Sequence, residues 1–327
     1  MTYLADKKTL YLLAPGLRIW LTPTQVRWQA DGRETQSHPR EGVRDIIVLS
    51  DATLDKSLFH FVADTHCPVS VLDTRFHFLA SINPPDGGSG NLRLRQYAFC
   101  SDGTKRLTTA RAIVAAKIAN QRMLLSEYNR VNATVEDAVI ALADEQTLLG
   151  LEGAAARVYF DAWSDILTKT PFTFDGRRKH PATDPVNALY DFAISLLTHE
   201  IDTFCRIVGL DAYIGVYHTS VHYRPALVAD LVEEWRAPIV DKFVLRALRR
   251  AEFSLDDFEE RGNACRFKSS CWGKAIVKWQ EWYAEEERDR NSYRPLTYRD
   301  WIEAQVRHFA RVCQGDEAEY RPYRYQP

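Results

Sequence analysis

The spacing of hydrophobic positions divides the chain into two parts with different secondary structure. Up to about residue 80, short runs rich in β-branched and aromatic residues alternate with turn formers, which is typical of strands. The turn Asp31-Gly32 between such runs predicts a hairpin. One helix is expected at 54–63, with Thr53 as its cap. The predicted strands are 9–14, 17–21, 25–30, 45–49, 69–72 and 76–80.

Beyond residue 91 the apolar residues recur every three or four positions, which predicts amphipathic helices. Pro238 should kink the predicted helix 226–250. The aromatic and basic tail, 317–327, is compatible with a packed strap or with a disordered end. The predicted helices are 105–128, 135–145, 148–167, 185–208, 226–250, 268–287 and 299–312.

Between the two parts, the segment 83–91 contains two prolines and three glycines and predicts a linker. We therefore expect an α+β protein, in which a small β-rich N-terminal domain is joined by a linker to a larger, all-helical C-terminal domain. The expected boundaries are 1–84, 85–91 and 92–327. A length of 327 residues agrees with two domains.

The composition is ordinary for a soluble globular protein, with 46% hydrophobic and 26% charged residues. No apolar stretch is long enough to predict a membrane span, and no secretion signal is recognisable, so we expect a cytoplasmic protein. The net charge of -2 counts mildly against nucleic-acid binding, although the local field over a patch decides it. Six cysteines without a C-x-x-C pair predict reduced, partly buried thiols.

One candidate for chemistry is Glu152, which interrupts a run of apolar and small residues. On a helix its neighbours would be Leu148, Ala155, Ala156 and Tyr159. A carboxylate on such a stripe is costly to bury unless it is paired or bound to a cation. A salt bridge to an arginine is therefore the alternative to a metal ligand.

A second group of candidates surrounds a turn and the helix that follows it. Asp230, Glu233 and Glu234 would share one helix face, where like charges repel unless a cation lies between them. A solvated acidic face is the ordinary alternative. His218 precedes Asp230 by twelve residues, so the two could meet only through a turn. His218 could equally be a hydrogen-bonded structural histidine, and His222 is its rival as a ligand.

One imidazole with two carboxylates suits Mg²⁺ or Mn²⁺ better than a structural zinc. Basic side chains recur on the predicted helix 226–250, and 177–180 is a short basic loop. They could contact phosphates without sequence preference, or be ordinary solvated charges. No phosphate-binding glycine loop and no nucleophile elbow is present in the sequence. The candidate DNA contacts are Arg178, Arg224, Arg236, Lys242 and Arg246.

Several blocks of the sequence resemble one known family. The helical part contains GLEGAAARVYF, DPVNALYDFAISLLTHEI, GLDAYIGVYH, RPALVADLVEEWRAPIVDKFVLRAL and a final YRPY. The N-terminal part contains LYLLAPGLRIWLTPTQVRW and PVSVLD. In order and position these blocks are similar to the CRISPR-associated integrase, the catalytic subunit of the bacterial and archaeal spacer-acquisition machinery. The run YDFAISLL departs from the more glycine-containing run of many relatives.

The resemblance implies a β-domain linked to a helical domain, and a homodimer. It also implies that two dimers flank a dimer of a small ferredoxin-like partner in a hetero-hexamer. By position, Glu152, His218 and Asp230 would be the catalytic metal ligands for Mg²⁺ or Mn²⁺. Some relatives use a Glu slightly downstream of that Asp, which makes Glu233 a second candidate.

The activity implied is that of a metal-dependent DNA endonuclease and integrase in the prokaryotic cytoplasm, acting in antiviral defence. A 3′-hydroxyl of the incoming spacer DNA would attack a phosphodiester of the CRISPR repeat array in a transesterification. Water in place of that hydroxyl would make the same site an endonuclease. The alternatives are a non-catalytic DNA-binding scaffold of the same complex and a metal-dependent phosphoesterase.

Overall fold

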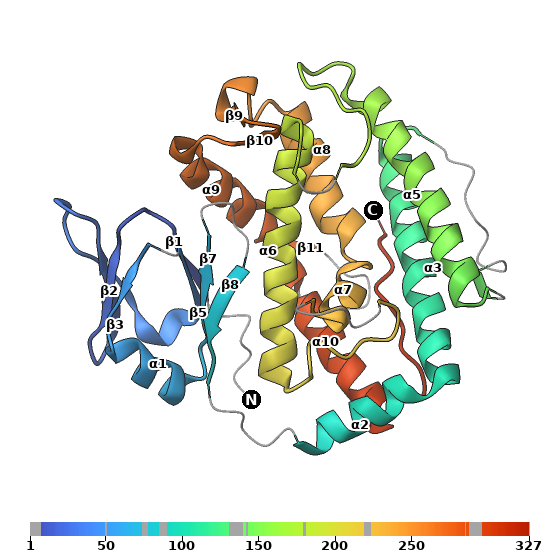
Figure 1. The fold of residues 1–327 in the computed structure, drawn as a ribbon, viewed down its shortest axis with the longest axis horizontal. Coiled ribbons are helices and arrows are strands. Elements are labelled where there is room, and N and C mark those ends of the chain that lie inside the picture. Colours follow the sequence, from blue (N-terminus) through green and yellow to red (C-terminus); the bar gives the residue numbers. More distant parts are fainter. Residues whose placement is uncertain are drawn as a thin grey trace. The chain divides into compact units, whose positions relative to one another are not determined.

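The computed structural model describes ten stretches of the chain. They are residues 8–49, 51–73, 78–84, 90–130, 140–141, 143–178, 181–218, 224–284, 286–287 and 296–326. The chain forms two compact units, shown in Figure 1. The first comprises Met1–Gly87 and Trp272–Val277, and the second Gly88–Cys271 and Lys278–Pro327. Most of the predicted linker lies outside the described residues, so its boundaries stay a prediction.

The first unit contains two four-stranded sheets. In one, with the order β1-β5-β7-β8, the first three strands are parallel and β8 is antiparallel to β7. The other has the order β4-β3-β2-β6. Every residue of β5 is buried, as a central parallel strand requires. The strands are β1 (Lys8–Leu12), β2 (Arg18–Leu21), β3 (Gln25–Gln29), β4 (Gln36–Pro39), β5 (Val43–Leu49), β6 (Thr53–Leu54), β7 (Val69–Leu72) and β8 (Phe78–Ile82).

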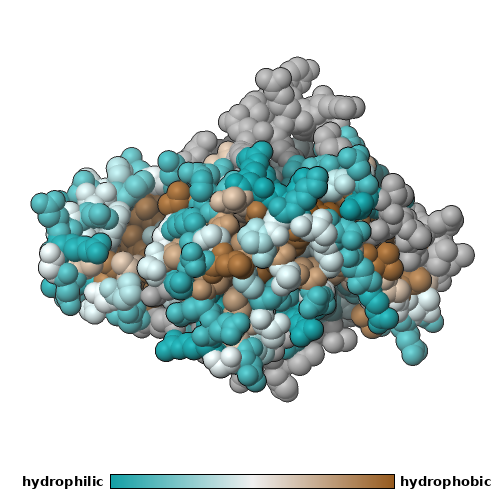
Figure 2. Space-filling model, turned by 90° about the horizontal axis from the view of Figure 1, so that it is seen from above, coloured by the Kyte–Doolittle hydropathy of each residue, from teal (hydrophilic) through white to brown (hydrophobic). Residues whose placement is uncertain are grey.

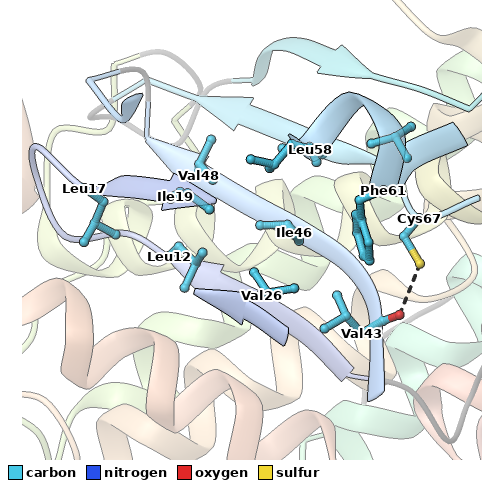
Figure 3. Packing of buried hydrophobic residues seen from close by; sticks show 12 residues of the cluster. Leu12, Leu17, Ile19, Val26, Val43, Ile46, Val48, Leu58, Phe61 and Cys67 are labelled. Atoms are coloured by element: carbon cyan, nitrogen blue, oxygen red, sulfur yellow. Dashed lines mark hydrogen bonds between the residues drawn. The ribbon is translucent and has the colours of Figure 1, made fainter. Parts of the chain in front are cut away.

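The core of this unit combines alternate residues of the strands with one face of helix α1 (Ser57–Thr65). Figure 3 shows Ile46 and Val48 of β5 packing with Leu58 and Phe61 of α1. The Cys67 thiol donates a hydrogen bond to the carbonyl of Val43, at 3.1 Å. All six cysteines lie in the described part of the chain, and all are free thiols.

The six strands predicted from the sequence are confirmed, apart from the first residues of the last one, which lie outside the described part. A hairpin at Asp31-Gly32 is confirmed, but its second strand is β4 and not the next predicted run, 45–49, which pairs with β1 and β7. β4 was missed because its sequence, QSHP, carries no apolar residue. The cap at Thr53 is wrong: Thr53 pairs with β2, and α1 begins at Ser57.

Helices dominate the second unit, and α6 (Pro185–Val208) packs against α7, α8 and α10 (Figure 1). The prediction of α6 is confirmed at both ends, and the structure shows what stops the helix at each end. Asp184 caps its first turn by accepting from the amide of Asn187, and Gly209 ends it at a φ of 92°. The other helices are α2 (Gly90–Ser101), α3 (Gly103–Glu127), α5 (Glu145–Leu167), α7 (Ala226–Val232), α8 (Lys242–Arg249) and α10 (Tyr298–Gln314). Helix α9 (Trp272–Tyr283) is divided, since its first half is counted with the first unit.

The expectation of an all-helical second part is wrong in detail. β9 (Phe258–Arg261) and β10 (Ala264–Phe267) form a hairpin, and β11 (Glu286–Glu287) pairs with β12 (Leu296–Thr297). Gly262, at a φ of 65°, supplies the turn between β9 and β10. The protein is therefore a mixed α/β protein with strands in both units.

Two helix predictions also need correction. α2 was missed because its polar and apolar residues alternate along NLRLR, which is not a helical period. The predicted helix 226–250 is divided into α7, a short turn, a π-helix η3 (Arg236–Asp241) and α8. Pro238 lies inside η3, so the interruption falls where the sequence predicted a kink. Of the predicted helix 135–145, residues 135–139 and 142 lie outside the described part.

The C-terminal tail is a packed strap, which decides the alternative left open by its composition. Tyr320 and Tyr325 are buried, at 4% and 3% exposure. The buried carboxylate of Glu234 accepts hydrogen bonds from the Tyr320 hydroxyl and the Tyr323 amide. Asn120 of α3 donates to the carbonyl of Tyr323 and accepts from the amide of Tyr325. The strap therefore joins α3 to the segment that follows α7.

Hydrophilic side chains predominate on the face drawn in Figure 2, and hydrophobic side chains lie among them in small groups. Within the described residues, no helix combines the length and the apolar character needed to cross a membrane.

The carboxyl of Asp241, at the end of η3, should make stability depend on pH. Tyr159 donates a hydrogen bond to its Oδ2 at 2.7 Å, while Oδ1 has no hydrogen-bond partner among the described atoms. Burial raises the pKa of Asp241 to about 6. Since the folded pKa lies above the unfolded value of 3.8, this group's stabilisation is complete below pH 3.8 and is lost as pH rises through about 6.

We therefore predict that wild type loses roughly 1 to 3 kcal/mol of unfolding free energy between pH 4 and pH 7 through this group. Asp241→Asn should lack that component, and Asp256→Asn, at an exposed site, should keep it. Urea unfolding of the three proteins across this range measures the difference. Parallel pH profiles for wild type and Asp241→Asn would show that the prediction is wrong.

Candidate metal centre

A cavity of about 590 Å³ in the second unit collects most of the predicted site residues. Helices α3 and α5 supply one side of it, and the segments around His218 and Glu233 supply another. Its lining is Lys117, Gln121, Glu152, Gly153, Ala156, Arg157, Phe160, Asp161, Asp175, Gly176, Arg177, Arg178, His218, Glu233 and Arg236.

Glu152 faces this cavity from the third turn of α5, and its side chain is 20% exposed. The Tyr217 hydroxyl donates a hydrogen bond to Oε2 at 2.8 Å, and the Lys117 ammonium donates to Oε1. Burial raises the pKa of Glu152, but the charge of Lys117 and the hydrogen bonds from Lys117 and Tyr217 together outweigh burial and leave the pKa below its ordinary value. The carboxyl is therefore ionised at neutral pH. The salt-bridge partner of Glu152 is Lys117, which is far from it in the sequence, and not the arginine expected as the alternative to a metal.

Asp230 lies behind the cavity wall, on α7, with no exposed surface. Its Oδ2 accepts hydrogen bonds from the amides of Val216 and Tyr217, at 2.6 and 3.1 Å. Its Oδ1 lies 2.8 Å from the amide nitrogen of His218 and 2.8 Å from Nδ1 of the same residue. Four donors therefore surround this carboxylate, and it fixes the loop before α7.

The close approach of that loop depends on Gly215. A Cβ at this position would lie 2.3 Å from Oδ2 of Asp230 and 2.9 Å from backbone atoms of Ala226 and Leu227. Backbone atoms cannot move aside as the end of a flexible side chain can. A glycine is thus needed here to let the amides of the loop reach the carboxylate.

His218 is held by Asp230 in one orientation. The carboxylate accepts from Nδ1, so this nitrogen carries a proton, and Nε2 has no hydrogen-bond partner among the described residues. Burial lowers the pKa of His218, but its hydrogen bond with Asp230 and that group's charge raise it more, to a net value above the ordinary one. A carboxylate that orients an imidazole in this way is common behind metal-binding histidines.

Glu233, and not Asp230, faces the cavity together with Glu152 and His218. Arg236 donates to its Oε1 at 2.8 Å, and the Lys117 ammonium lies 2.5 Å from its Oε2. The Oε2 atom nevertheless has no well-aligned hydrogen bond among the described atoms. Burial raises the pKa of Glu233, but Arg236 and Lys117 outweigh burial and hold the pKa well below its usual range.

The acidic cluster of α7 is therefore not a solvated face. Asp230, Glu233 and Glu234 are 0%, 4% and 0% exposed, and each has a different set of partners. Asp230 binds the preceding loop, Glu233 faces the cavity, and Glu234 binds the C-terminal strap.

Within the described ranges, no group of three or more His, Cys, Asp and Glu side chains could hold a metal ion as it stands. The chemistry of the donors around the cavity nevertheless fits Mg²⁺ or Mn²⁺. Glu152 and Glu233 are ionised, the neutral form of His218 presents the lone pair of Nε2, and Oε2 of Glu233 lacks an aligned donor. A cationic group already lies between the two carboxylates, namely the ammonium of Lys117.

The predicted DNA contacts are in different environments. Arg178 lines the cavity and is exposed, as is Arg157, which the sequence did not single out as a DNA contact. No described hydrogen bond or ion pair engages the side chains of these two arginines. Arg224 is also exposed. Arg236 instead binds Glu233 and the hydroxyl of Tyr190, so the structure gives it a supporting role.

Lys242 and Arg246 line a separate cavity of about 460 Å³, together with Arg249 and Arg250. The ammonium of Lys242 lies 3.5 Å from the carboxylate of Glu127. The remaining residues of the sequence-based site, His222 and the basic pair at 179–180, lie outside the described part of the chain.

Comparison with known proteins shows what the whole chain is similar to. The family model for CRISPR associated protein Cas1 matches residues 10–281. A CRISPR-associated exonuclease Cas4/endonuclease Cas1 fusion of Rhodospirillum rubrum is 31% identical over 331 residues, and the match spans 96% of this chain and 57% of the fusion. CRISPR-associated endonuclease Cas1 1 of Moorella thermoacetica is 30% identical over 339 residues, spanning 97% of this chain and 98% of that protein.

Solved structures share the fold at lower identity. Thermotoga maritima Cas1 superposes with a TM-score of 0.84 at 20% identity, over 96% of this chain and 98% of its own. A casposase bound to its integration product gives 0.83 at 20% identity, over 98% and 94%. A chain of a Cas6-RT-Cas1–Cas2 complex gives 0.81 at 18% identity, over 98% of this chain and 36% of its own.

The contact between Asp230 and His218 leads to a prediction about one pKa. Asp230→Asn removes the negative charge beside Nδ1, so the pKa of His218 should fall. Since the new amide faces two backbone N–H donors, stability should also fall by roughly 1 to 3 kcal/mol. An NMR titration of the histidine side chains, with His218→Gln for assignment, measures the pKa. An unchanged pKa in a folded Asp230→Asn protein would contradict this account.

Proposed function

The chain belongs to the CRISPR-associated Cas1 family, and on that premise we propose that it is a divalent-metal-dependent DNA integrase and endonuclease. Its proposed role is to insert new spacer DNA into a CRISPR array as part of antiviral defence. The observation that carries this proposal is the cavity that Glu152, His218 and Glu233 all line, with the ammonium of Lys117 in contact with both carboxylates.

The proposed ligands for Mg²⁺ or Mn²⁺ are Glu152, His218 and Glu233. The sequence pointed to Asp230 as the third ligand, but the four donors around its carboxylate give it a different proposed role, that of a positioning residue for His218. A bound divalent cation would polarise a phosphoryl oxygen and lower the pKa of the attacking or leaving hydroxyl. Three protein ligands would leave coordination positions for water and phosphate oxygens.

The proposed reaction exchanges one phosphodiester for another. The 3′-oxygen of the incoming DNA forms a bond to a phosphorus of the repeat array, and the bond from that phosphorus to its own 3′-oxygen breaks. The proton of the attacking hydroxyl is balanced by the proton that the leaving 3′-oxygen takes up. With water as the attacking group, the same exchange is a hydrolysis, which is the endonuclease activity.

In this reaction the protein's own side chains would orient the metal ligands and neutralise the charge of the phosphates. Asp230 keeps His218 in one orientation, and Tyr217 donates to Glu152. Arg157 and Arg178 are exposed at the cavity and can bind the phosphates that flank the reacting one. Positioning and charge neutralisation are the main requirements of phosphoryl transfer.

We further propose DNA, a second copy of the chain and a small ferredoxin-like subunit of the Cas2 type as partners. The family resemblance implies a homodimer and a hetero-hexamer. Among the proteins that share the fold, one is a casposase bound to an integration product and another is part of a complex with Cas2. The second cavity, lined by Lys242 and Arg246, is a proposed phosphate contact outside the reaction centre. The boundaries 1–84, 85–91 and 92–327 remain the proposed domain division.

The experiment is strand transfer of a short DNA duplex into a supercoiled plasmid that carries CRISPR repeats, with the small partner protein added. Wild type should join the DNA with Mg²⁺ or Mn²⁺ and not with EDTA. Glu152→Gln and Glu233→Gln should lower the rate by about a hundredfold or more, because each removes a charge at the reacting phosphate. Both should still bind DNA in a gel-shift assay.

Glu145→Gln is the matched control, since Glu145 lies in the first turn of the same helix, α5, and pairs with Arg106 at the surface. It should join DNA at the wild-type rate. Joining by Glu152→Gln at that rate would refute the proposed site. If wild type and all three variants bind DNA in a salt-sensitive way but none of them joins it, the protein is instead a DNA-binding scaffold.

A further inference from the structure

The ammonium of Lys117 lies where a metal ion would be expected between two acidic ligands. Lys117 belongs to α3, and its side chain is 6% exposed. It contacts Oε1 of Glu152, on α5, and Oε2 of Glu233, just after α7. One positive charge therefore joins two carboxylates that come from separate elements.

This arrangement solves an electrostatic problem of the metal-free protein. Burial raises the pKa of both carboxyls, and two ionised carboxylates so close to one cation would also repel each other. Lys117 lowers the pKa of both. A lysine this far buried is in turn rare unless it is paired. Lys117, Glu152 and Glu233 thus stabilise one another without a metal ion.

Arg236 does not play the same part. It contacts only Oε1 of Glu233, and it also donates to the hydroxyl of Tyr190. Lys117 contacts Oε1 of Glu152 and Oε2 of Glu233, so an ion held by these two carboxylates would compete with Lys117 for them. Binding of such an ion therefore conflicts with Lys117 and not with Arg236.

We propose that Lys117 is a built-in counter-cation of the metal site, which holds Glu152 and Glu233 together in the metal-free protein and competes with the divalent cation for them. This inference rests on the proposed function of the site. A divalent ion and an ammonium on the same oxygens repel each other, so metal binding includes displacement of Lys117.

The displaced ammonium stays attached to α3 beside the cavity, where a phosphate of DNA would be a partner of opposite charge. Metal binding would then free Lys117 for the phosphate, and phosphate binding would draw Lys117 away from the carboxylates. The two ligands would favour each other, and linkage requires that effect to be equal in both directions. Lys117 would thus make metal loading respond to the presence of substrate.

The test compares Mn²⁺ affinity in the absence of DNA, by titration with electron paramagnetic resonance of the free ion. Lys117→Met is neutral and of similar length, so it removes the competition and should bind Mn²⁺ about tenfold more tightly than wild type. Its melting temperature without metal should be lower than that of wild type, and Mn²⁺ should raise it by more. Lys278→Met, which removes a surface lysine of α9, should match wild type.

A folded Lys117→Met protein with unchanged or weaker Mn²⁺ affinity would overturn the proposal. If that variant does not fold, Lys117→Arg decides, because a planar guanidinium that binds both carboxylates should compete more strongly than an ammonium. Mn²⁺ affinity at or below that of wild type is expected for Lys117→Arg, and tighter binding would overturn the proposal.

Glu152→Gln separates this inference from the proposed function. If Glu152→Gln binds Mn²⁺ as wild type does, the proposed metal site is wrong. If Glu152→Gln loses Mn²⁺ while Lys117→Met binds it no more tightly than wild type, the metal site stands and only the role of Lys117 is rejected.

Discussion

Burial of three carboxylates within five residues, from Asp230 to Glu234, is the constraint on which the second unit depends. Each buried anion needs donors or cations of its own, because an unpaired buried charge costs several kcal/mol. Asp230 is hydrogen bonded to the loop that follows α6, Glu233 forms a salt bridge with a lysine of α3, and Glu234 is hydrogen bonded to the C-terminal strap. Segments far apart in the sequence are therefore fixed around α7 by the need to neutralise one short acidic run.

The same network provides the candidate chemistry. The loop held by Asp230 ends in His218, and the lysine held by Glu233 also reaches Glu152 on α5. Stabilising contacts thus bring two carboxylates and an imidazole to one cavity. In the proposed metal site, each ligand is placed by an interaction that the fold already requires. Gly215 matters for this reason, as it lets the backbone approach Asp230 closely.

Much of this architecture could be predicted from local sequence. α6 was predicted from its apolar period, and its observed ends at an aspartate cap and a glycine are local signals as well. The longer apolar strands of the first unit were predictable, whereas the polar β4 and the short strands of the second unit were not. The choice between Asp230 and Glu233 could not be made, because residues three apart share a helix face, and which of them faces the cavity depends on a loop contact that no periodicity shows. A signal for Lys117 did exist: it is a lone cation among Ala116, Ile118 and their apolar neighbours, which implies a buried carboxylate partner.

The most direct measurement of the central claim is a crystal structure with Mn²⁺, in which the ion is located by its anomalous scattering. The account predicts one peak in the cavity, bonded to Glu152, Glu233 and Nε2 of His218, with Asp230 still hydrogen bonded to the loop before α7 and Lys117 moved away from the carboxylates. A peak bonded to Asp230, or a peak beside an unmoved Lys117, would contradict it.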